Sequence, residues 1–314
     1  MRRYIIRRIL LIIPTVALVS FLVFCIVRLI PGDAVQLMVA EQGFADDTEE
    51  LRAMLGLDKP LLTQYFNYMN GVFHGDLGIS LWSGEPVMSE ITRRLPLSFE
   101  LACMALLWTF LMGVPIGVMS ALKQDGWLDY IIRSWAIGGL SIPGFWIATL
   151  ILVFGAIWFK WVPPMDYIPF RENPIQNLSQ LVVPSLVMSL AMSASIMRMT
   201  RTMMLEVMRE DYIRTANAKG LTGWAVVVRH ALKNAMIPVL SIMGLQLAFL
   251  VGGTVIMESI FVLPGVGKYL LDAITWRDYP VIQGINLFIC TLIITINLTV
   301  DIIYGFLDPR IRYQ

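Results

Sequence analysis

Long apolar runs separated by charged segments are the feature that most constrains how this chain can fold. A helix needs about 20 apolar residues to cross a bilayer, and the runs that approach or exceed this length are residues 9–30, 97–122, 131–159, 181–199, 237–257 and 281–306. Of the 314 residues, 57% are hydrophobic and only 15% are charged, a composition outside that of soluble domains. The sequence therefore predicts an all-α polytopic membrane protein with about six transmembrane helices.

Basic residues predict the orientation of these helices, because Lys and Arg concentrate on the cytoplasmic side of a membrane. Basic clusters occur before the first run, between the fourth and fifth runs, and after the last run: Arg2, Arg3, Arg7 and Arg8, then 198–233, then Arg310 and Arg312. We therefore expect both termini in the cytoplasm. The first run is longer than the core of a cleaved signal peptide and lacks small cleavage-site residues, so it is expected to remain as a helix.

The runs and the segments between them predict four regions. These are an N-terminal transmembrane helix at 1–30, an extracytoplasmic subdomain at 31–96, a core domain of five transmembrane helices at 97–308, and a cytoplasmic tail at 309–314. Within the core, residues 200–236 form a cytoplasmic loop and residues 259–280 an extracytoplasmic loop. In the subdomain, helices are expected near 48–54 and 61–73, and interleaved aromatic residues favour a packed unit over a solvated linker.

The segment from Glu206 to Pro238 is the longest basic, helix-forming stretch outside the apolar runs. Acidic residues come early and Lys219 comes late, an order that complements the helix dipole. Gly220 is expected to end this helix, because glycine readily adopts the left-handed conformation of a helix C-cap. A second helix is expected to begin near Trp224 and to end near Pro238. The alternative is a solvated amphipathic loop that only satisfies charge topology.

The amino-acid sequence of this segment resembles that of a known loop. DYIRTANAKGL (211–221) and VVRHALKNAMIP (227–238) resemble the cytoplasmic "EAA" loop of ABC-importer permeases, in the form seen in the dipeptide, oligopeptide and nickel permease family. Gly220, Ala216 and Leu232 hold the glycine, second alanine and leucine of the general pattern. The departures, which the peptide family largely shares, are Arg214 for the glutamate, Thr215 for the first alanine, His230 for the isoleucine and Lys233 for the proline.

The resemblance extends over nearly the whole chain, through PGD (31–33), LGLDKPLLTQYFNY (55–68), GDLGIS (75–80), 258–284 and DPRIRYQ (308–314). It implies a type I ABC importer permease fold with a small extracytoplasmic subdomain after the first helix. The implied function is a permease subunit that forms half of a pathway for di- or oligopeptides by alternating access. The same machinery carrying nickel, glutathione or oligosaccharide is the alternative cargo.

The resemblance also implies partners and a location. The implied partners are a homologous second permease, two ATPase subunits that bind ATP and Mg, and an extracytoplasmic substrate-binding protein. No cofactor in this chain and no nucleic acid are implied, and the location is a bacterial or archaeal plasma membrane, in contact with lipid. Residues 206–236 would couple the chain to the ATPases, and the coupling residues are Glu210, Asp211, Tyr212, Arg214, Thr215, Ala216, Lys219 and Gly220.

Helix breakers and charges inside the apolar runs are the candidates for the pathway itself. Charges within the runs are few: Arg28, Glu100, Glu258 and Asp301. The pathway or gating candidates are Pro143, Gly252, Gly253 and Glu258. Glycine and proline allow close packing or kinks in membrane helices, and plain packing is the alternative role for each. A secondary transporter would be expected to show a series of intramembrane acids, and none is visible.

Catalytic patterns are not found in the sequence. The two histidines, His74 and His230, are predicted on opposite sides of the membrane, so they cannot share a metal or nucleophile site. The GVGK segment lacks the spacing of a phosphate loop, because Val262 stands where the first glycine belongs and Tyr269 follows the lysine. An integral membrane enzyme is therefore the weakest class.

The interpretation of the chain as a permease subunit predicts that the purified chain alone hydrolyses no ATP, because its sequence contains no phosphate-binding loop. A phosphate-release assay on the detergent-purified chain, freed of every ATPase subunit, tests the prediction. Hydrolysis that persists after this removal would contradict it, and the reconstituted complex serves as the positive control.

Overall fold

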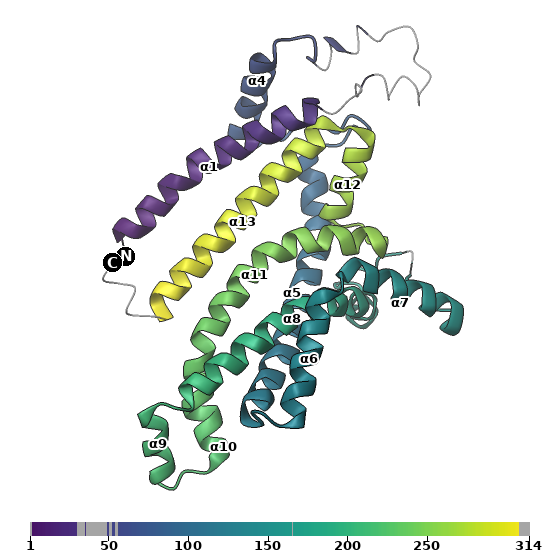
Figure 1. The fold of residues 1–314 in the computed structure, drawn as a ribbon. Helices are drawn as coiled ribbons and strands as arrows, with labels where there is room; N and C mark the ends of the chain where they lie inside the picture. The colour runs from purple at the N-terminus through teal and green to yellow at the C-terminus, as the bar shows by residue number, and fades with distance from the viewer. Residues whose placement is uncertain are drawn as a thin grey trace. The chain divides into compact units, whose positions relative to one another are not determined.

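The structure is a computed structural model that describes residues 2–29, 35, 49, 52–53, 56–164 and 166–307. Figure 1 shows the helices of this part of the chain. Their bounds are α1 Arg2–Leu29, α4 Leu61–Phe73, α5 Val87–Leu122, α6 Trp127–Ser141, α7 Gly144–Phe159, α8 Pro174–Val207, α9 Asp211–Ala218, α10 Gly223–Ala225, the π-helix η1 Val226–Leu232, α11 Lys233–Ile260, α12 Val266–Trp276 and α13 Tyr279–Leu307.

Among the described residues, five helical segments are long and apolar enough to cross a membrane, or up to six if a bent pair counts as one span. They are Leu10–Leu29, Val87–Leu122, Pro174–Val207, Gly223–Ile260 and Tyr279–Val300. The prediction of an all-α polytopic protein with about six spans is confirmed. The predicted tail at 309–314 lies outside the described residues.

The predicted span at 131–159 is a bent pair of helices, divided at Pro143, one of the helix breakers noted in the sequence. α6 and α7 meet at an angle of 92°. Ile142, before the proline, is extended at φ −99° and ψ 122°, and Pro143 itself is not helical, at φ −61° and ψ 132°. Proline removes a backbone donor and disfavours helical geometry in the preceding residue, which accounts for the break at this point.

The chain divides into two compact units, of which the first comprises Met1–Ser98 and Pro264–Thr295. Its core is formed by apolar side chains from α1, α5, α12 and α13, with Val87, Ile91, Val281 and Ile285 fully buried. The predicted helix at 61–73 is confirmed as α4 with these bounds. Of the predicted helix at 48–54, only three residues are described: Glu49, Arg52 and Ala53.

The segment before α5 is joined to the α12–α13 connection by polar contacts within this unit. The Ser80 hydroxyl donates to the Asp278 carboxylate at 2.6 Å, and the Trp82 indole donates to the Trp276 carbonyl at 2.8 Å. Burial raises the pKa of Asp278, against the opposing effect of the Ser80 hydrogen bond. Tyr279, the first residue of α13, is buried in the core with 8% of its surface exposed.

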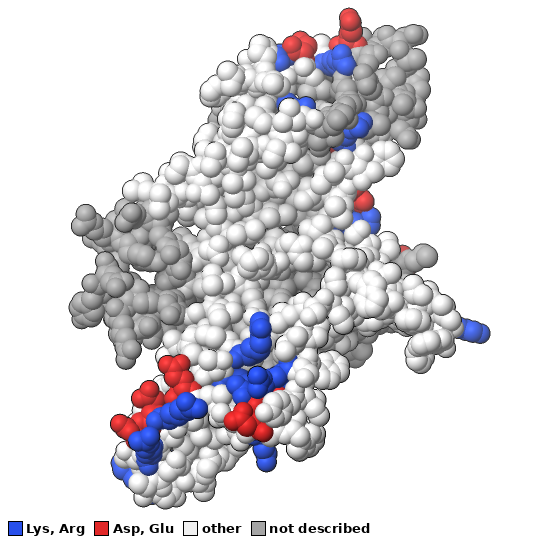
Figure 2. Space-filling view, viewed as in Figure 1, with Lys and Arg blue, Asp and Glu red and all other residues white. Residues whose placement is uncertain are grey.

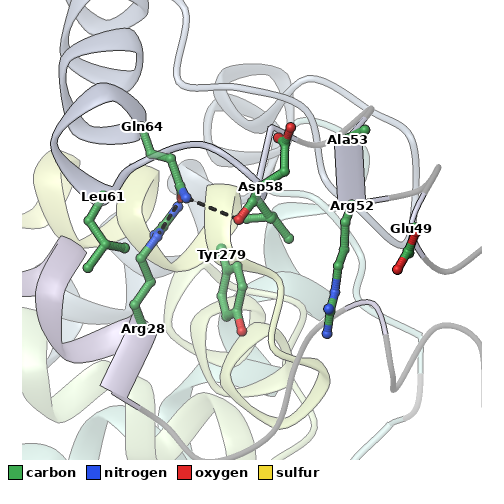
Figure 3. A pocket seen from close by; sticks show the side chains of 9 residues that line it. Arg28, Glu49, Arg52, Ala53, Asp58, Leu61, Gln64 and Tyr279 are labelled. Atoms are coloured by element: carbon green, nitrogen blue, oxygen red, sulfur yellow. Dashed lines mark hydrogen bonds between the residues drawn. The ribbon is translucent and has the colours of Figure 1, made fainter.

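Arg28, one of the charges within the predicted spans, connects α1 to α4. Its Nε donates to Gln64 Oε1 at 2.9 Å, and its guanidinium carbon lies 3.9 Å from the centre of the Phe24 ring. The Gln64 amide in turn donates to the carbonyls of Leu57 and Lys59. As Figure 3 shows, this contact forms one side of a cavity of about 570 Å³ whose further lining includes Glu49, Arg52, Asp58 and Tyr279. Arg28 therefore has a structural role in attaching α4 to α1.

The second unit comprises Phe99–Leu263 and Ile296–Gln314. Within it, α5 and α8 approach closely at two glycines one turn apart. A Cβ atom on Gly113 would lie 2.8 Å from the Ile196 side chain, and one on Gly117 would lie 2.7 Å from the Met197 carbonyl oxygen. Small residues at such positions let two helix backbones come together in a membrane.

Gly117→Ala is expected to destabilise the protein by about 1–3 kcal/mol, the usual cost of overpacking, because a carbonyl oxygen of a helix cannot move aside as a side chain can. Thermal unfolding of the purified protein in detergent measures the effect. Gly138→Ala is the matched control, because nothing lies within 4 Å of a Cβ at that position. An equal loss of stability in both variants would contradict the close approach of α5 and α8.

Candidate functional site

The region around α9 is an exposed, charged element that connects two membrane-length helices. α8 ends at Val207, and a turn with hydrogen bonds from Arg209 N–H to Glu206 O and from Glu210 N–H to Val207 O leads to α9. Glu210 is extended at φ −70° and ψ 147°, so it occupies the N-cap position of α9, and its side chain makes no capping hydrogen bond. The expectation of one helix from Glu206 onward is therefore wrong, and Glu206 belongs to α8.

Gly220 ends α9, as predicted. Its φ is +78°, in the left-handed region. The Gly220 N–H donates to the Asn217 carbonyl at 2.9 Å, and the Leu221 N–H donates to the Ala216 carbonyl at 3.4 Å. These two hydrogen bonds form a Schellman motif, which satisfies carbonyl groups at the helix end. The turn that follows α9 is thereby set by backbone geometry.

α9 packs onto the rest of the unit through one apolar face. Ile213 and Ala216, three residues apart and therefore on one side of the helix, are 1% and 6% exposed. They join a cluster with Met204 of α8 and with Val226, Val227 and Ala231 of η1. The Asn234 amide of α11 also donates to the Tyr212 hydroxyl, at 2.8 Å. α9 thus contacts both neighbouring membrane helices, α8 and the segment formed by η1 and α11.

The other face of α9 is exposed and charged. Arg214 and Asp211 form an ion pair at 3.1 Å, with side chains 75% and 92% exposed. Glu210, Thr215, Lys219 and Gly220 are also exposed. An exposed pair of this kind stabilises a helix little. This face is therefore available for contact with another molecule.

The helix after the turn continues much further than predicted. α10, η1 and α11 form one helical segment that reaches Ile260, with Pro238 inside α11, so the prediction of a helix end near Pro238 is wrong. A helix end within a bilayer would leave several backbone groups without partners, which costs more than the single hydrogen bond that proline removes. The π-helix Val226–Leu232 lies directly over the apolar face of α9.

Figure 2 shows that Lys, Arg, Asp and Glu side chains gather over the end of α8 and over α9. A surface hollow of about 550 Å³ lies here, lined by Arg201, Thr202, Leu205, Glu206, Arg209, Glu210 and Asp211. Two of the predicted site residues, Glu210 and Asp211, are thus brought together with side chains of α8. The contribution of α8 was not predicted.

A buried ionic cluster next to this hollow was missed by sequence reasoning. Asp129 of α6 is fully buried and accepts two hydrogen bonds from Arg201 of α8, from Nε at 2.8 Å and from Nη2 at 2.6 Å. The Ser120 hydroxyl of α5 and the Asp125 N–H also donate to this carboxylate. In the sequence both charges stand beside apolar runs and look like ordinary interfacial residues, so only their pairing in space distinguishes them.

Glu100, another charge within the predicted spans, is held by a second polar cluster. The Tyr167 hydroxyl and the Asn177 amide each donate to Glu100 Oε2 at 3.1 Å. Tyr167 lies in the segment between α7 and α8. Burial, with smaller effects of Glu100, raises its pKa to about 12, so the phenol remains a neutral donor. The side chain of Asp301, the remaining acidic residue in the runs besides Glu258, lies outside the described side chains.

The four pathway candidates occupy different environments. Pro143 is exposed at the bend between α6 and α7. On α11, Gly252 faces open space, Gly253 lies 3.4 Å from Met188 Cε measured from an ideal Cβ, and Glu258 is fully buried. Their role in a pathway stays a prediction. Within the described part of the chain, no group of three or more His, Cys, Asp or Glu residues is arranged to hold a metal ion.

The fold matches a solved transporter. An inward-facing structure of the MetNI methionine ABC transporter contains a chain that superposes with a TM-score of 0.54 over 71% of this chain and 99% of that chain, at 18% sequence identity. At this identity the similarity shows the fold alone. The chain therefore has the fold of a chain of an ABC transporter.

The sequence comparisons identify the family. Residues 113–313 match the family described as "Binding-protein-dependent transport system inner membrane component", and residues 1–102 match the family of its N-terminal part. The chain belongs to this family. It is 39% identical to the dipeptide transport system permease protein of Escherichia coli (strain K12) and 39% identical to a putative peptide transport system permease protein of Brucella abortus (strain 2308), in each case over 100% of both chains. It is therefore a transport subunit and not an enzyme.

The buried face of α9 predicts how its attachment can be weakened. Ile213→Ala removes the largest buried side chain of α9, and truncation of such a residue typically costs about 2–5 kcal/mol. We expect faster amide hydrogen exchange in α9, because the helix will separate more often from α8 and η1. Arg214→Ala is the control, since this side chain is exposed. Equal acceleration in the two variants would show that the apolar face does not hold α9.

Proposed function

We propose that this permease carries peptides and that α9 is the element through which ATPase subunits move it. The observation that supports the coupling role most directly is the two-sided character of α9: an apolar face is fixed to α8 and η1, while a charged face is exposed. The names of the relatives from Escherichia coli and Brucella abortus support the peptide cargo. The match to these proteins covers the full chain, so it spans the region around α9.

The proposed complex contains a second, similar permease, two ATPase subunits and an extracytoplasmic binding protein that delivers the peptide. Both termini and α9 lie in the cytoplasm, in agreement with the basic residues around α9 and at the chain ends. ATP and Mg are held by the ATPases, and this chain holds no cofactor. The segment 259–280, which includes α12, then lies on the outer side, where the binding protein arrives.

The geometry of α9 determines how coupling would work. The ATPases approach one another when they bind ATP, and a groove on one of them receives the exposed face of α9, with Asp211, Tyr212 and Arg214 at the contact. A displacement of α9 is passed to α8 through Met204 and to α11 through η1, because these residues share one packed cluster. Coupling requires that α9 makes different contacts in the two ATPase states, since only a differential interaction can shift an equilibrium between conformations.

The experiment that tests the whole assignment is purification of this chain from its native membrane in mild detergent, followed by identification of the proteins bound to it. A second permease and ATPases, with ATP hydrolysis raised by peptide-loaded binding protein, would support the proposal. Transport by this chain without any ATPase partner would contradict it. Stimulation by nickel, glutathione or oligosaccharide in place of peptide would contradict the cargo alone.

Gly220→Pro is expected to uncouple transport from ATP hydrolysis while the protein remains in the membrane. Proline cannot adopt φ +78° and has no N–H to donate to Asn217, so the turn after α9 must change. Charge reversal at Arg214 is expected to act similarly by altering the exposed face. The measurement is peptide uptake relative to ATP hydrolysis by the reconstituted complex.

Gly223→Ala is the matched control, because this glycine has no positive φ and nothing lies within 4 Å of its ideal Cβ. It should transport as the unmodified protein does. Normal uptake by both Gly220→Pro and the Arg214 variant, at unchanged membrane levels, would remove the coupling role from α9.

A further inference from the structure

The buried ionic cluster of Ser120, Asp129 and Arg201, called here the Asp129 cluster, joins three helices of the second unit. Ser120 comes from α5, Asp129 from the first turn of α6 and Arg201 from α8. The guanidinium uses two of its nitrogens on the two carboxylate oxygens, at 2.8 and 2.6 Å. Bidentate pairing of this kind fixes direction as well as distance. The cluster therefore sets the orientation of α6 on α8.

The energetics of the pair indicate that it does more than hold the fold together. Asp129 is fully buried and the Arg201 side chain is only 18% exposed, so both charges lost most of their hydration. The desolvation cost of a buried pair offsets much of its attraction, and neutral residues of similar size are often equally stabilising. Apolar contacts between α6 and α8 already exist, through Ala136, Ala194 and Met197. Attachment alone does not require the charges.

The position of the cluster connects it to α9. Arg201 lies on α8, six residues before its end at Val207, and it also lines the hollow shared with Glu210 and Asp211. On α5, Ser120 lies three residues after Gly117, the position at which the backbones of α5 and α8 are in close contact. The cluster thus stands where the end of α8, the start of α6 and the end of α5 meet.

We propose that Asp129, Arg201 and Ser120 are positioning residues that make α6 follow α8, so that a displacement received by α9 reaches the bend between α6 and α7. This inference rests on the proposed coupling role of α9. α6 has no direct connection to α9 along the chain, and its first turn is attached to α8 by the most directional contact of the cluster. When α6 moves with α8, the movement reaches the bend at Pro143, and there it changes the orientation of α7 relative to α8.

The test must separate this role from simple stabilisation. Asp129→Asn alone leaves the Arg201 charge buried without a partner and is expected to reduce folding. The double variant Asp129→Asn with Arg201→Gln removes both charges and keeps side chains of similar size, so it is expected to reach the membrane and to bind the ATPases normally. Arg201→Lys keeps the charge but loses bidentate geometry. Arg133→Gln, which removes an exposed charge one turn along α6, is the matched control.

The primary measurement is amide hydrogen exchange of the complete transporter complex with and without ATP. In the unmodified complex, ATP is expected to change exchange in α9 and in α6. In the double variant the change in α9 should remain and the change in α6 should be lost, with an intermediate result for Arg201→Lys and an unmodified result for Arg133→Gln. ATP hydrolysed per dialanine transported should rise about 5-fold or more in the double variant, the lower end of typical coupling effects.

The outcomes distinguish this inference from the proposed function. If α6 in the double variant still responds to ATP as in the unmodified complex, the inference is overturned while the role of α9 stands. If α9 itself does not respond to ATP in the unmodified complex, and Gly220→Pro remains coupled, the proposed function fails first. A double variant that is absent from the membrane would show that the charges are needed for folding, and this would also overturn the inference.

Discussion

The need to satisfy every backbone hydrogen bond inside a bilayer is the constraint on which the rest of this structure depends. With no water available, a spanning segment of this kind must stay helical. This explains why the helix after α9 continues through Pro238 to Ile260. α9 ends outside the spans, at Gly220, where the Schellman hydrogen bonds satisfy the helix end. A helix in this chain therefore ends where its last backbone groups find other hydrogen-bond partners.

The helices formed in this way carry few charges, and three of them, buried or half-buried, have specific partners. Arg28 is held by Gln64 and Phe24, Glu100 by Tyr167 and Asn177, and Asp129 by Arg201. Phe24 lies on α1 with Arg28, whereas the hydrogen bonds of these charges join elements that are separate in the sequence. Because an unpaired buried charge is costly, these contacts restrict how the helices can be arranged. Apolar contacts between helices are less selective among such arrangements, because the hydrophobic effect has no preferred direction.

α9 shows how a short helix can be both fixed and available. An isolated helix of eight residues is not stable in water, so α9 depends on Ile213 and Ala216 against α8 and η1. Its charged residues contribute little to this attachment and remain exposed. The division of roles between the two faces permits the contact with another subunit that we propose. It also gives a physical reason for three positions of the pattern at 211–221, namely Ile213, Ala216 and Gly220.

Several features were predictable from the sequence because they depend on local chemistry. The apolar runs determined the helices, the position of α4 followed from its pattern, and Gly220 was identified as a helix end because few other residues adopt a positive φ easily. The family followed from the sequence motif at 211–238 and from the further matching segments along the chain. Glu210 and Asp211 were predicted to be coupling residues, and this role stays a prediction. The helix was expected to begin too early, since a propensity argument cannot locate the turn at Met208 to Glu210.

What only the tertiary structure decided is the set of contacts between distant segments. The bend at Pro143 follows local rules, but its angle of 92° does not. The burial of Tyr279, the close contact of Gly117 with Met197 and the pairing of Asp129 with Arg201 join residues far apart in the chain. The sequence by itself determined the membrane helices, the helix end at Gly220 and the family, because these follow from hydropathy, backbone preference and motif. The structure decided which charges meet, because pairing depends on the position of each helix against the others.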